Sequence, residues 1–478
     1  MNKIVKIIFI FALCLFISGL LDAQSITWER IYDGPDEFNL PDGGYDICEA
    51  DSGNYYLAGY ATFQSAGNRP WIIKINSFGD TIWTCVIRSI VATSAMACAR
   101  SKDGGCVVTG DGTQPWVAKL DRNGNVNWLR VYPGYITRVY SIINSSDGGY
   151  AACGKTMYDS AIVFKIDSIG ELDWIKVFRA GNYIRFDDIS EIYNGYMLTG
   201  NISGSNSGFQ FPMIFKVNKS GGFIGKKIYN EFYNSVSNSI QNINNDEYLI
   251  GGSCRDSTNT RNQGFMMRID TSGSILFKKV FYSDYSESLN DVVIISDNRY
   301  ALAYMKSMGI LMFGKASIVD SAGKVYFEKE FPNPSFIEFR SVLPLSNGDI
   351  IFTGVAEFCD FNCEDIYAVR TDSTLNYKPL NINYNNSFIP PDFKLYPAYP
   401  NPFNPVTKFK FDIPKNGNVI IRIFDITGKQ VNEILNQDIL IGQYDAEYYA
   451  SSQSSGVYFA ALYFNNRLIQ SQKILLIR

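Results

Sequence analysis

The chain has 478 residues and a formal net charge of −4, with 19% charged residues. This small charge argues against electrostatic capture of nucleic acid, which needs a basic face to displace counterions. Histidine is absent, which excludes Ser-His-Asp and Cys-His catalysis and every histidine-ligated metal site. The length favours two or more domains, and an aromatic content of 15% suits strands better than long helices.

Residues 1–23 have the features of a secretory signal peptide. Lys3 and Lys6 make a basic start, Ile7 to Leu21 is apolar, and Ala23 is the small residue expected before a cut at Gln24. A membrane anchor is the alternative, but the apolar run is short for a full span. We expect no transmembrane segment in the mature chain.

A repeated unit organises the chain from there to about residue 380, and the stretch Asp103 to Trp128 is a clear copy. A full copy has a Gly-rich turn, an apolar run, a Lys-x-Asp segment, a second Gly turn and a closing aromatic residue. The first three copies are the sharpest and the last is the most decayed. The Asp or Asn that ends the Lys-x-Asp segment recurs every 45 to 52 residues, at Asn76, Asp121, Asp167, Asn218, Asp270, Asp320 and Asp372. This period is typical of a four-stranded propeller blade.

Short β runs at regular turn spacing, with no helical periodicity, indicate an all-β array. Seven units predict a seven-bladed β-propeller over residues 24–380. The closing aromatic residues, such as Trp83, Trp128 and Trp174, are predicted to wedge between blades. The last copy has Leu375 and Pro379 where the first three copies have Gly and Trp. We therefore expect the N-terminal segment Ile26 to Tyr32 to complete the seventh blade.

The Lys-x-Asp pairs are predicted to be structural rather than catalytic, since residues two apart share one face of a strand. The Asp-x-x-Gly-x-x-x-Trp pattern resembles the tryptophan-docking repeat of quinoprotein propellers and the sialidase Asp-box, but its Asp-to-Gly spacing differs from both. Neither resemblance carries an active site to this chain. The repeats are more similar to the Gly-Gly-Tyr and Trp-x-x-Lys-x-Asp-x-x-Gly repeats of secreted bacterial propellers.

Residues 381–392 are polar, contain two prolines and predict a linker. Residues 393–478 form a different unit. Four prolines between Pro397 and Pro405 forbid a helix, and the alternating runs that follow predict a small Ig-like β-sandwich.

This last unit resembles the type A sorting domain of type IX secretion, on four motifs in order. They are Tyr-Pro-Asn-Pro-Phe-Asn-Pro, Asp-Ile-Thr-Gly-Lys, Ser-Gly-Val-Tyr and a terminal Gln-Lys-Ile strand. The residues concerned are Tyr399, Pro400, Asn401, Pro402, Phe403, Asn404, Pro405, Asp425, Gly428, Lys429, Gly456, Tyr458 and Lys473. The resemblance implies the type IX translocon and its sorting peptidase as partners. It also implies removal of this domain and an extracellular or outer-membrane surface location. An ordinary adhesive sandwich domain is the alternative.

Eight cysteines follow the signal peptide, and an exported protein can oxidise them. Cys359 and Cys363 bracket a short loop and are the first disulfide candidate, with Cys98 and Cys106 as a weaker pair. The other cysteines lie in strand-like runs and are predicted to be small buried apolar side chains. No paired CxxC indicates zinc.

Two acidic clusters, Asp33 to Glu37 and Cys359 to Asp365, offer oxygen ligands that suit calcium. Neither has EF-hand spacing, and solvated loops are the favoured interpretation. No other cofactor and no catalytic residue is predicted.

Three functions stay open. The first is an exported, non-enzymatic propeller that binds polysaccharide, protein or another surface component. The second is a glycan hydrolase or lyase that uses carboxylates in the propeller channel. The third, ranked last, is a quinone-dependent dehydrogenase. A fold alone does not decide among them.

Overall fold

The structure is a computed structural model. It describes residues 27–35, 40–89, 91–180, 183–203, 209–244, 246–255, 261–296, 298–309, 311–331, 336–357, 364–377, 390, 392–415, 417–439, 442–450 and 453–477. The predicted signal peptide lies outside these residues, as does nearly all of the predicted linker. No helix in the described part of the chain is long and apolar enough to cross a membrane.

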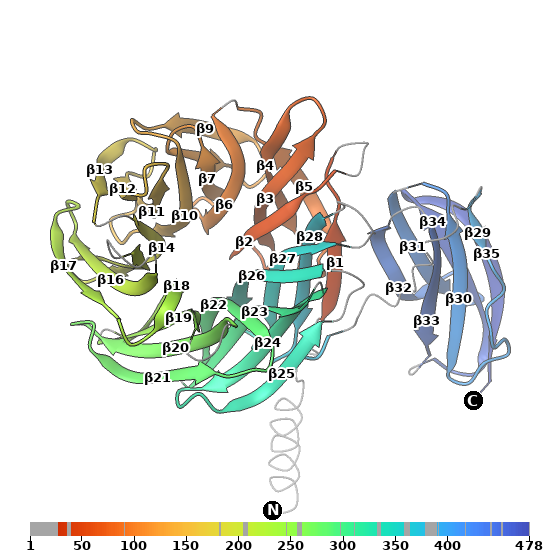
Figure 1. The fold of residues 1–478 in the computed structure, drawn as a ribbon. Helices are drawn as coiled ribbons and strands as arrows, with labels where there is room; N and C mark the ends of the chain where they lie inside the picture. Colours follow the sequence, from red (N-terminus) through yellow and green to blue (C-terminus); the bar gives the residue numbers. More distant parts are fainter. Residues whose placement is uncertain are drawn as a thin grey trace, which may run out of the picture.

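Strands β1 to β28 form seven antiparallel four-stranded units arranged in a ring (Figure 1). The first four blades are β2 (Gly43–Glu49), β3 (Tyr55–Phe63), β4 (Gly67–Ile75), β5 (Thr81–Val86); β6 (Ala92–Arg100), β7 (Cys106–Gly112), β8 (Trp116–Leu120), β9 (Val126–Val131); β10 (Thr137–Asn144), β11 (Tyr150–Thr156), β12 (Ala161–Ile166), β13 (Leu172–Phe178); and β14 (Tyr183–Ile192), β15 (Gly195–Ser203), β16 (Gln210–Asn218), β17 (Phe223–Ile228).

The remaining blades are β18 (Tyr233–Asn244), β19 (Glu247–Arg255), β20 (Gln263–Asp270), β21 (Ile275–Phe281); β22 (Ser286–Ser296), β23 (Arg299–Met308), β24 (Leu311–Asp320), β25 (Val325–Phe331); and β26 (Phe336–Pro344), β27 (Ile350–Glu357), β28 (Glu364–Thr371), β1 (Trp28–Tyr32). Short bridges between β7 and β10 and between β24 and β26 join neighbouring blades. The predicted seven-bladed propeller is confirmed.

The N-terminal strand closes the ring, as the sequence predicts. Strand β1 pairs antiparallel with β28, with Trp28 opposite Arg370 and Tyr32 opposite Ile366. The last blade therefore combines three strands from the end of the propeller with one from its beginning. Such a closure leaves no open edge between the first and last blades.

The recurring Asp or Asn is the acceptor of a tight turn after the third strand of each blade. In Asp121, Oδ1 accepts the backbone N–H groups of Asn123 and Asn125 at 2.8 and 2.9 Å. The same pair of bonds occurs at the other six anchors. The third residue after the anchor needs a positive φ, which is 88° at Gly124 and explains the Gly. In the last repeat this position is Leu375, which adopts a positive φ of 65° although it is not a glycine.

The closing tryptophans pack across the blade interfaces, as predicted. The indole of Trp83 lies against Gly124 of the next blade and donates its Nε1–H to the carbonyl of Arg122 at 2.9 Å. Trp28 makes the equivalent contacts with Gly79 and Ser77. Trp28 is thus the closing tryptophan of the seventh blade, supplied by the other end of the propeller.

The lysine of the Lys-x-Asp segment is structural, but its partner is not the aspartate two residues on. Lys74, Lys119 and Lys165 form ion pairs with Asp51, Asp103 and Asp147, at 2.6, 2.7 and 2.9 Å. These acids belong to the Gly-rich turn before the second strand of each blade. In these three blades an ion pair therefore joins the Gly-rich turn to the Lys-x-Asp segment of the same repeat.

The C-terminal unit is a sandwich of two sheets (Figure 1). One contains β29 (Lys394–Leu395), β30 (Val406–Ile413) and β33 (Gly442–Tyr449). The other contains β32 (Gln430–Ile439), β31 (Gly417–Phe424), β34 (Gly456–Phe464) and β35 (Arg467–Leu476). Phe409, Phe411, Ile421 and Leu462 are fully buried between the sheets. The predicted small β-sandwich is confirmed.

Candidate functional site

The innermost strand of every blade carries a β-bulge at the same place. The bulged residues are Tyr45, Met96, Tyr140, Asp187, Asn238, Asn290 and Arg340. The innermost strands surround the centre of the ring (Figure 1). A bulge interrupts strand pairing and redirects side chains, and here it separates two sets of residues with different roles.

The residues directly after the bulges form a hydrogen-bonded belt, which we define as Asp46, Ser141, Asp188, Ser239, Asp291 and Ser341. The hydroxyl of Ser341 donates to Asp46 Oδ1 at 2.8 Å. Ser141 donates to Asp188, and Ser239 to Asp291, each at 2.7 Å. The second blade has Ala97 at this position, so the belt is interrupted there.

Each belt aspartate also binds backbone on two sides. Its Oδ1 accepts the N–H of the next residue at 2.8 Å, and its Oδ2 accepts an N–H from the following blade. The latter donors are Cys98 and Ile240 at 2.8 Å and Val342 at 3.0 Å. One carboxylate thus joins three blades, because its serine partner comes from the preceding blade.

The belt carboxyls lose hydration, and this raises their pKa. The pKa of Asp188 is raised to about 7 and that of Asp291 to about 6, while that of Asp46 is also raised. Desolvation is the largest cause, and hydrogen bonds to the carboxylates oppose it. A carboxyl that titrates near neutrality can serve as a general acid. Here both oxygens of each group accept bonds from the protein, which favours a structural role.

Four of the bulged residues lie in a cluster of polar and aromatic side chains, which we call the mouth and define as Tyr45, Tyr60, Asp111, Arg138, Tyr140, Arg185, Asp187, Glu338 and Arg340. Its arginines are held by carboxylates. Arg138 Nε lies 2.8 Å from Asp111, Arg185 Nε lies 2.9 Å from Asp187, and Arg340 Nη2 lies 2.8 Å from Glu338.

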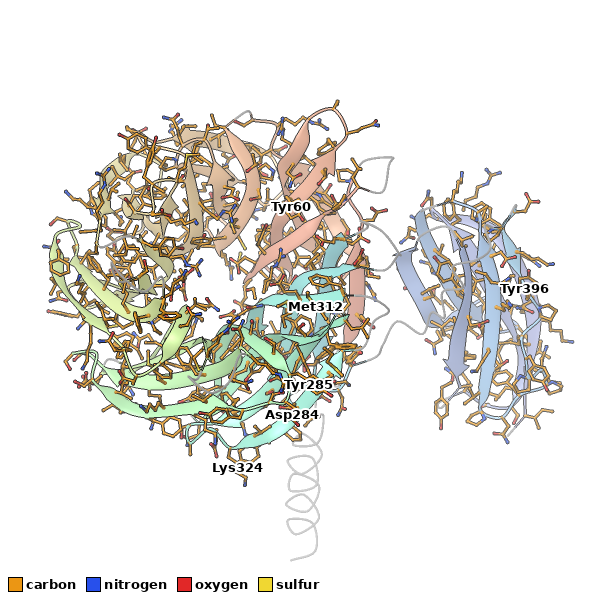
Figure 2. The ribbon with its side chains drawn as sticks, viewed as in Figure 1. Tyr60, Asp284, Tyr285, Met312, Lys324 and Tyr396 are labelled. Carbon is orange, nitrogen blue, oxygen red and sulfur yellow. The ribbon has the colours of Figure 1, made fainter. Side chains whose placement is uncertain are left out.

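Two of these arginines also stand over tyrosine rings. The guanidinium carbon of Arg340 is 4.6 Å from the ring centre of Tyr45, and that of Arg185 is 5.7 Å from Tyr140. The ring centres of Tyr60 and Tyr45 are 5.8 Å apart, and Tyr60 lies on β3 of the first blade (Figure 2). The mouth therefore presents planar polar groups and aromatic rings together.

An exposed aromatic shelf adjoins the mouth on the third blade. We define it as Tyr135, Ile136, Met157 and Tyr158. Tyr135 and Tyr158 are 57% and 60% exposed, and their rings meet edge to face at 5.1 Å. The N–H of Met157 bonds to the carbonyl of Ile136 at 2.9 Å, which holds the two halves together. Large apolar side chains gathered on a surface mark binding sites more often than chance.

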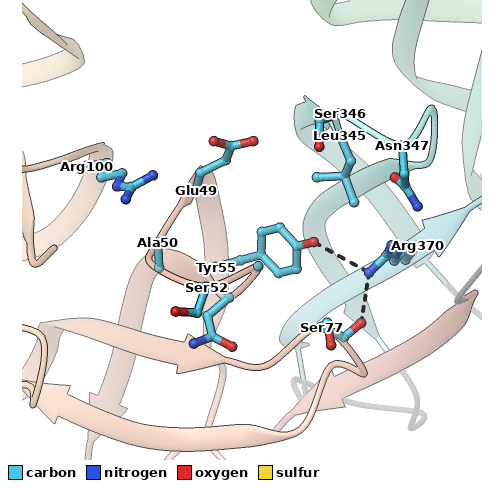
Figure 3. A pocket seen from close by; sticks show the side chains of 12 residues that line it. Glu49, Ala50, Ser52, Tyr55, Ser77, Arg100, Leu345, Ser346, Asn347 and Arg370 are labelled. Atoms are coloured by element: carbon cyan, nitrogen blue, oxygen red, sulfur yellow. Dashed lines mark hydrogen bonds between the residues drawn. The ribbon is translucent and has the colours of Figure 1, made fainter.

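A pocket of about 320 Å³ lies at the other end of the innermost strands, between the first and last blades (Figure 3). Arg370 lines it but is already bound, with Nη2 2.7 Å from Asp349 and Nη1 2.9 Å from the carbonyl of Ser77. Glu49 is the single acidic residue among the described residues that line the pocket. The pocket therefore lacks the pair of carboxylates that glycoside hydrolysis needs.

Three carboxylates gather where the ring closes. Oxygens of Asp33, Asp42 and Asp365 all lie within 4.8 Å of one another. Asp33 and Asp365 come from the two predicted acidic clusters, and the pairing of β1 with β28 brings them together. Sequence reasoning missed Asp42, which accepts the N–H of Thr62 at 2.9 Å. Oxygen ligands of this kind suit calcium.

The first disulfide candidate, Cys359 with Cys363, lies outside the described residues. The weaker candidates are out of register, because Cys98 lies opposite Val108 and Cys106 opposite Arg100. Of the cysteines predicted to be small buried side chains, Cys153 and Cys254 are buried, while Cys48 and Cys85 are half-buried. Cys98 and Cys106 are also buried.

The residues of the predicted sorting motif gather around the terminal strand β35. The amide of Asn401 donates to the carbonyl of Lys473 at 3.2 Å and accepts the N–H of Leu475 at 2.9 Å. The buried Phe403 bonds through its N–H to the carbonyl of Leu475 at 2.9 Å. The proline-rich segment thus fastens the end of the chain to the sandwich.

The other motif residues take separate places. Asp425 forms the same turn as the propeller anchors, with Gly428 at a φ of 82°. The hydroxyl of buried Tyr458 donates to the carbonyl of Ser454 at 2.8 Å. Gly456 begins β34, opposite Leu476. Pro405 is half-buried, and the exposed members are Tyr399, Pro400, Asn401, Pro402, Asn404, Gly428, Lys429 and Lys473.

Comparison with known proteins identifies the C-terminal unit. Residues 397–477 match the family described as the secretion system C-terminal sorting domain. A search of curated proteins gave no match. Among solved structures, a protein of unknown function from Bacteroides caccae is similar, with 12% identity and a TM-score of 0.39 over 61% of this chain and 94% of that one. The sorting domain directs type IX export, so the protein is extracellular or at the cell surface.

Proposed function

We propose that the exported propeller binds polysaccharide, without cleaving it, at the mouth and the aromatic shelf beside it. The shelf is the observation that carries the proposal. Its two exposed tyrosines offer flat apolar surfaces, which suit the faces of sugar rings, while the arginine and carboxylate groups of the mouth suit hydroxyls.

The shelf and the mouth are continuous. Arg138 follows Ile136 by two residues and lies opposite Lys155 in the ladder between β10 and β11. Lys155 in turn stands 5.6 Å from the ring of Tyr183 at the start of β14. A chain of sugars could therefore run from the shelf across the third and fourth blades towards the centre of the ring.

Binding is favoured over hydrolysis because the acids of the mouth and belt are engaged. Asp111, Asp187 and Glu338 each hold an arginine, and the belt aspartates accept three hydrogen bonds each. Catalytic carboxyls in a glycosidase must exchange protons with substrate or water. Acids that are already bound to protein donors are poorly placed for that work.

The test is binding of the purified full chain to a polysaccharide array, with release of reducing sugar followed in the same wells. We expect retention on some glycans without release. Tyr135→Ala/Tyr158→Ala should lose at least tenfold in affinity, because stacking contributes about 1 kcal/mol or more per ring. Tyr193→Ala is the matched control, because Tyr193 is fully exposed at the turn between β14 and β15. Sugar release, or equal losses in both variants, would contradict the proposal.

Calcium binding by Asp33, Asp42 and Asp365 also stays a proposal, supported by the grouping of their carboxylates at the ring closure. Calcium should raise the melting temperature of the full chain, and magnesium should not, because calcium accepts more irregular oxygen sites. Asp42→Asn should abolish the rise. An unchanged melting temperature in millimolar calcium contradicts this site and leaves the glycan proposal untouched.

A further inference from the structure

The innermost strands follow a rule that assigns partners across each blade interface. The residue directly after the belt position faces the preceding blade, and the next residue faces the following blade. Between blades six and seven, Val293 and Val342 meet in one apolar cluster. Between blades three and four, Ile143 and Ile189 meet in the same way. These contacts are aliphatic.

At the interface of blades one and two, the same rule brings together two cysteines. Cys48 lies two residues after Asp46, and Cys98 lies directly after Ala97, the second blade's counterpart of the belt residues. Both belong to the apolar cluster between these blades. The thiol of Cys98 lies 3.8 Å from the carbonyl of Tyr56, and Tyr56 is the direct cross-strand partner of Cys48.

The backbones at this point are also held in place. The N–H of Cys98 bonds to Asp46 Oδ2 at 2.8 Å, and Asp46 is two residues from Cys48 on the same strand. Side chains two residues apart on a strand share a face, so Cys48 projects on the side where Asp46 meets Cys98. The geometry is that of adjacent thiols on two neighbouring blades.

We propose that Cys48 and Cys98 form a disulfide that joins the first and second blades of the exported protein. The sorting domain places the chain outside the cytoplasm, where disulfides form and persist. Both cysteines are free thiols in the structure. Among the described innermost strands, no other pair of positions related by this rule holds two cysteines.

The reaction is thiol–disulfide exchange with an oxidised periplasmic dithiol protein. One cysteine thiolate attacks the donor disulfide and forms a mixed disulfide, and one donor sulfur leaves as a thiolate. The second cysteine then attacks, so the Sγ–Sγ bond forms and the donor departs as a dithiol carrying two electrons. Burial and the neighbouring Cys48 raise the pKa of the Cys98 thiol, which slows attack in the folded state. Oxidation therefore belongs to the folding stage, before the blades close.

Peptide mapping of the full chain, secreted or made in the periplasm, tests the pairing. The protein is alkylated with N-ethylmaleimide under denaturing, non-reducing conditions and cut with trypsin. Because trypsin does not cut between Arg69 and Pro70, Cys48 is alone in peptide 31–74, and Cys98 is alone in 89–100. We expect these two peptides to be linked. Full alkylation of both cysteines, or a link to Cys85 in peptide 75–88 or Cys106 in 103–119, would overturn the proposal.

Thermal melting gives an independent measurement. Reduction should lower the melting temperature of the parent by roughly 5 °C, because the bond closes a loop of about 50 residues in the unfolded chain. Cys48→Ser and Cys98→Ala should each melt near the reduced parent and show no further change with reductant. Cys153→Ala, which alters a buried cysteine of the third blade, should keep the full response. A parent that ignores reductant contradicts the disulfide.

Discussion

On several innermost strands a residue of the mouth and a residue of the belt are consecutive, yet they have different roles. Asp188 in the belt is bound by a serine and two backbone N–H groups. Its neighbour Asp187 faces Arg185 and the amide of Asn201 in the mouth. Because the bulge turns these two consecutive side chains in different directions, one of them stabilises the ring and the other lies in the mouth.

The largest effect should come from breaking the ring itself, on which both belt and mouth depend. Deletion of residues 24–33 removes β1 and the Trp28 contacts with the first blade. We expect loss of the cooperative thermal transition measured by circular dichroism or calorimetry. Deletion of residues 381–390, in the predicted linker, is the control of equal length. A closing-strand deletion that melts like the parent contradicts the role of β1.

The belt should be the next most sensitive region. Asp291→Ala leaves Ser239 and two N–H groups without their shared acceptor. We expect a loss of about 2–4 kcal/mol in the free energy of unfolding, measured by chemical denaturation. Asp291→Asn, which keeps an acceptor oxygen of similar shape, should lose less. Equal losses would indicate that charge, rather than hydrogen bonding, is what the belt requires.

The pH dependence of stability separates the belt from the surface. The pKa of Asp188 is about 7 in the folded chain and about 3.9 in an unfolded one. The folded state therefore binds more protons between these values. This contribution is fully present below about pH 4 and is lost as the pH rises through 7. Between pH 5 and pH 8 this contribution to the free energy of unfolding should fall by about 2–3 kcal/mol, and Asp188→Asn should flatten the pH dependence. A parent whose stability rises over that range contradicts the assignment.

The mouth and shelf should be the least sensitive in stability. Tyr135→Ala/Tyr158→Ala removes exposed rings, so the free energy of unfolding should change by less than about 1 kcal/mol, although glycan binding is lost. Denaturation of this variant beside Asp291→Ala compares the two regions directly. A loss as large as that of the belt variant would show that the shelf supports the fold.

The sequence predicts the repeated turns well because their chemistry is local. An Asp or Asn accepts two nearby N–H groups, and a Gly three residues later takes a positive φ. Ring closure was also predictable. The last repeat has no tryptophan of its own, and Trp28 stands before the first repeat without the earlier strands of a blade.

The hydrogen-bonded belt could not be predicted from the sequence in the same way. Its position holds Asp46, Ala97, Ser141 and Asp188 in successive blades, so no single residue type marks it. A recurring Asp or Ser before Ile or Val, about 50 residues apart, was the available signal. Its meaning depends on the bulges, which decide the side-chain directions. The calcium candidates could not be grouped from the sequence either. Asp33 and Asp365 are distant in sequence, and only the pairing of β1 with β28 brings them together.

The closure of the ring by β1 also determines where the propeller can be held. Both ends of its chain leave from one blade, since β1 and β28 are paired there. A tether joined to either end pulls on that blade alone, and the six others stay free of it. The blade with the aromatic shelf, β10 to β13, lies across the ring from this point (Figure 1). The shelf therefore lies on a blade that carries no attachment of the chain ends.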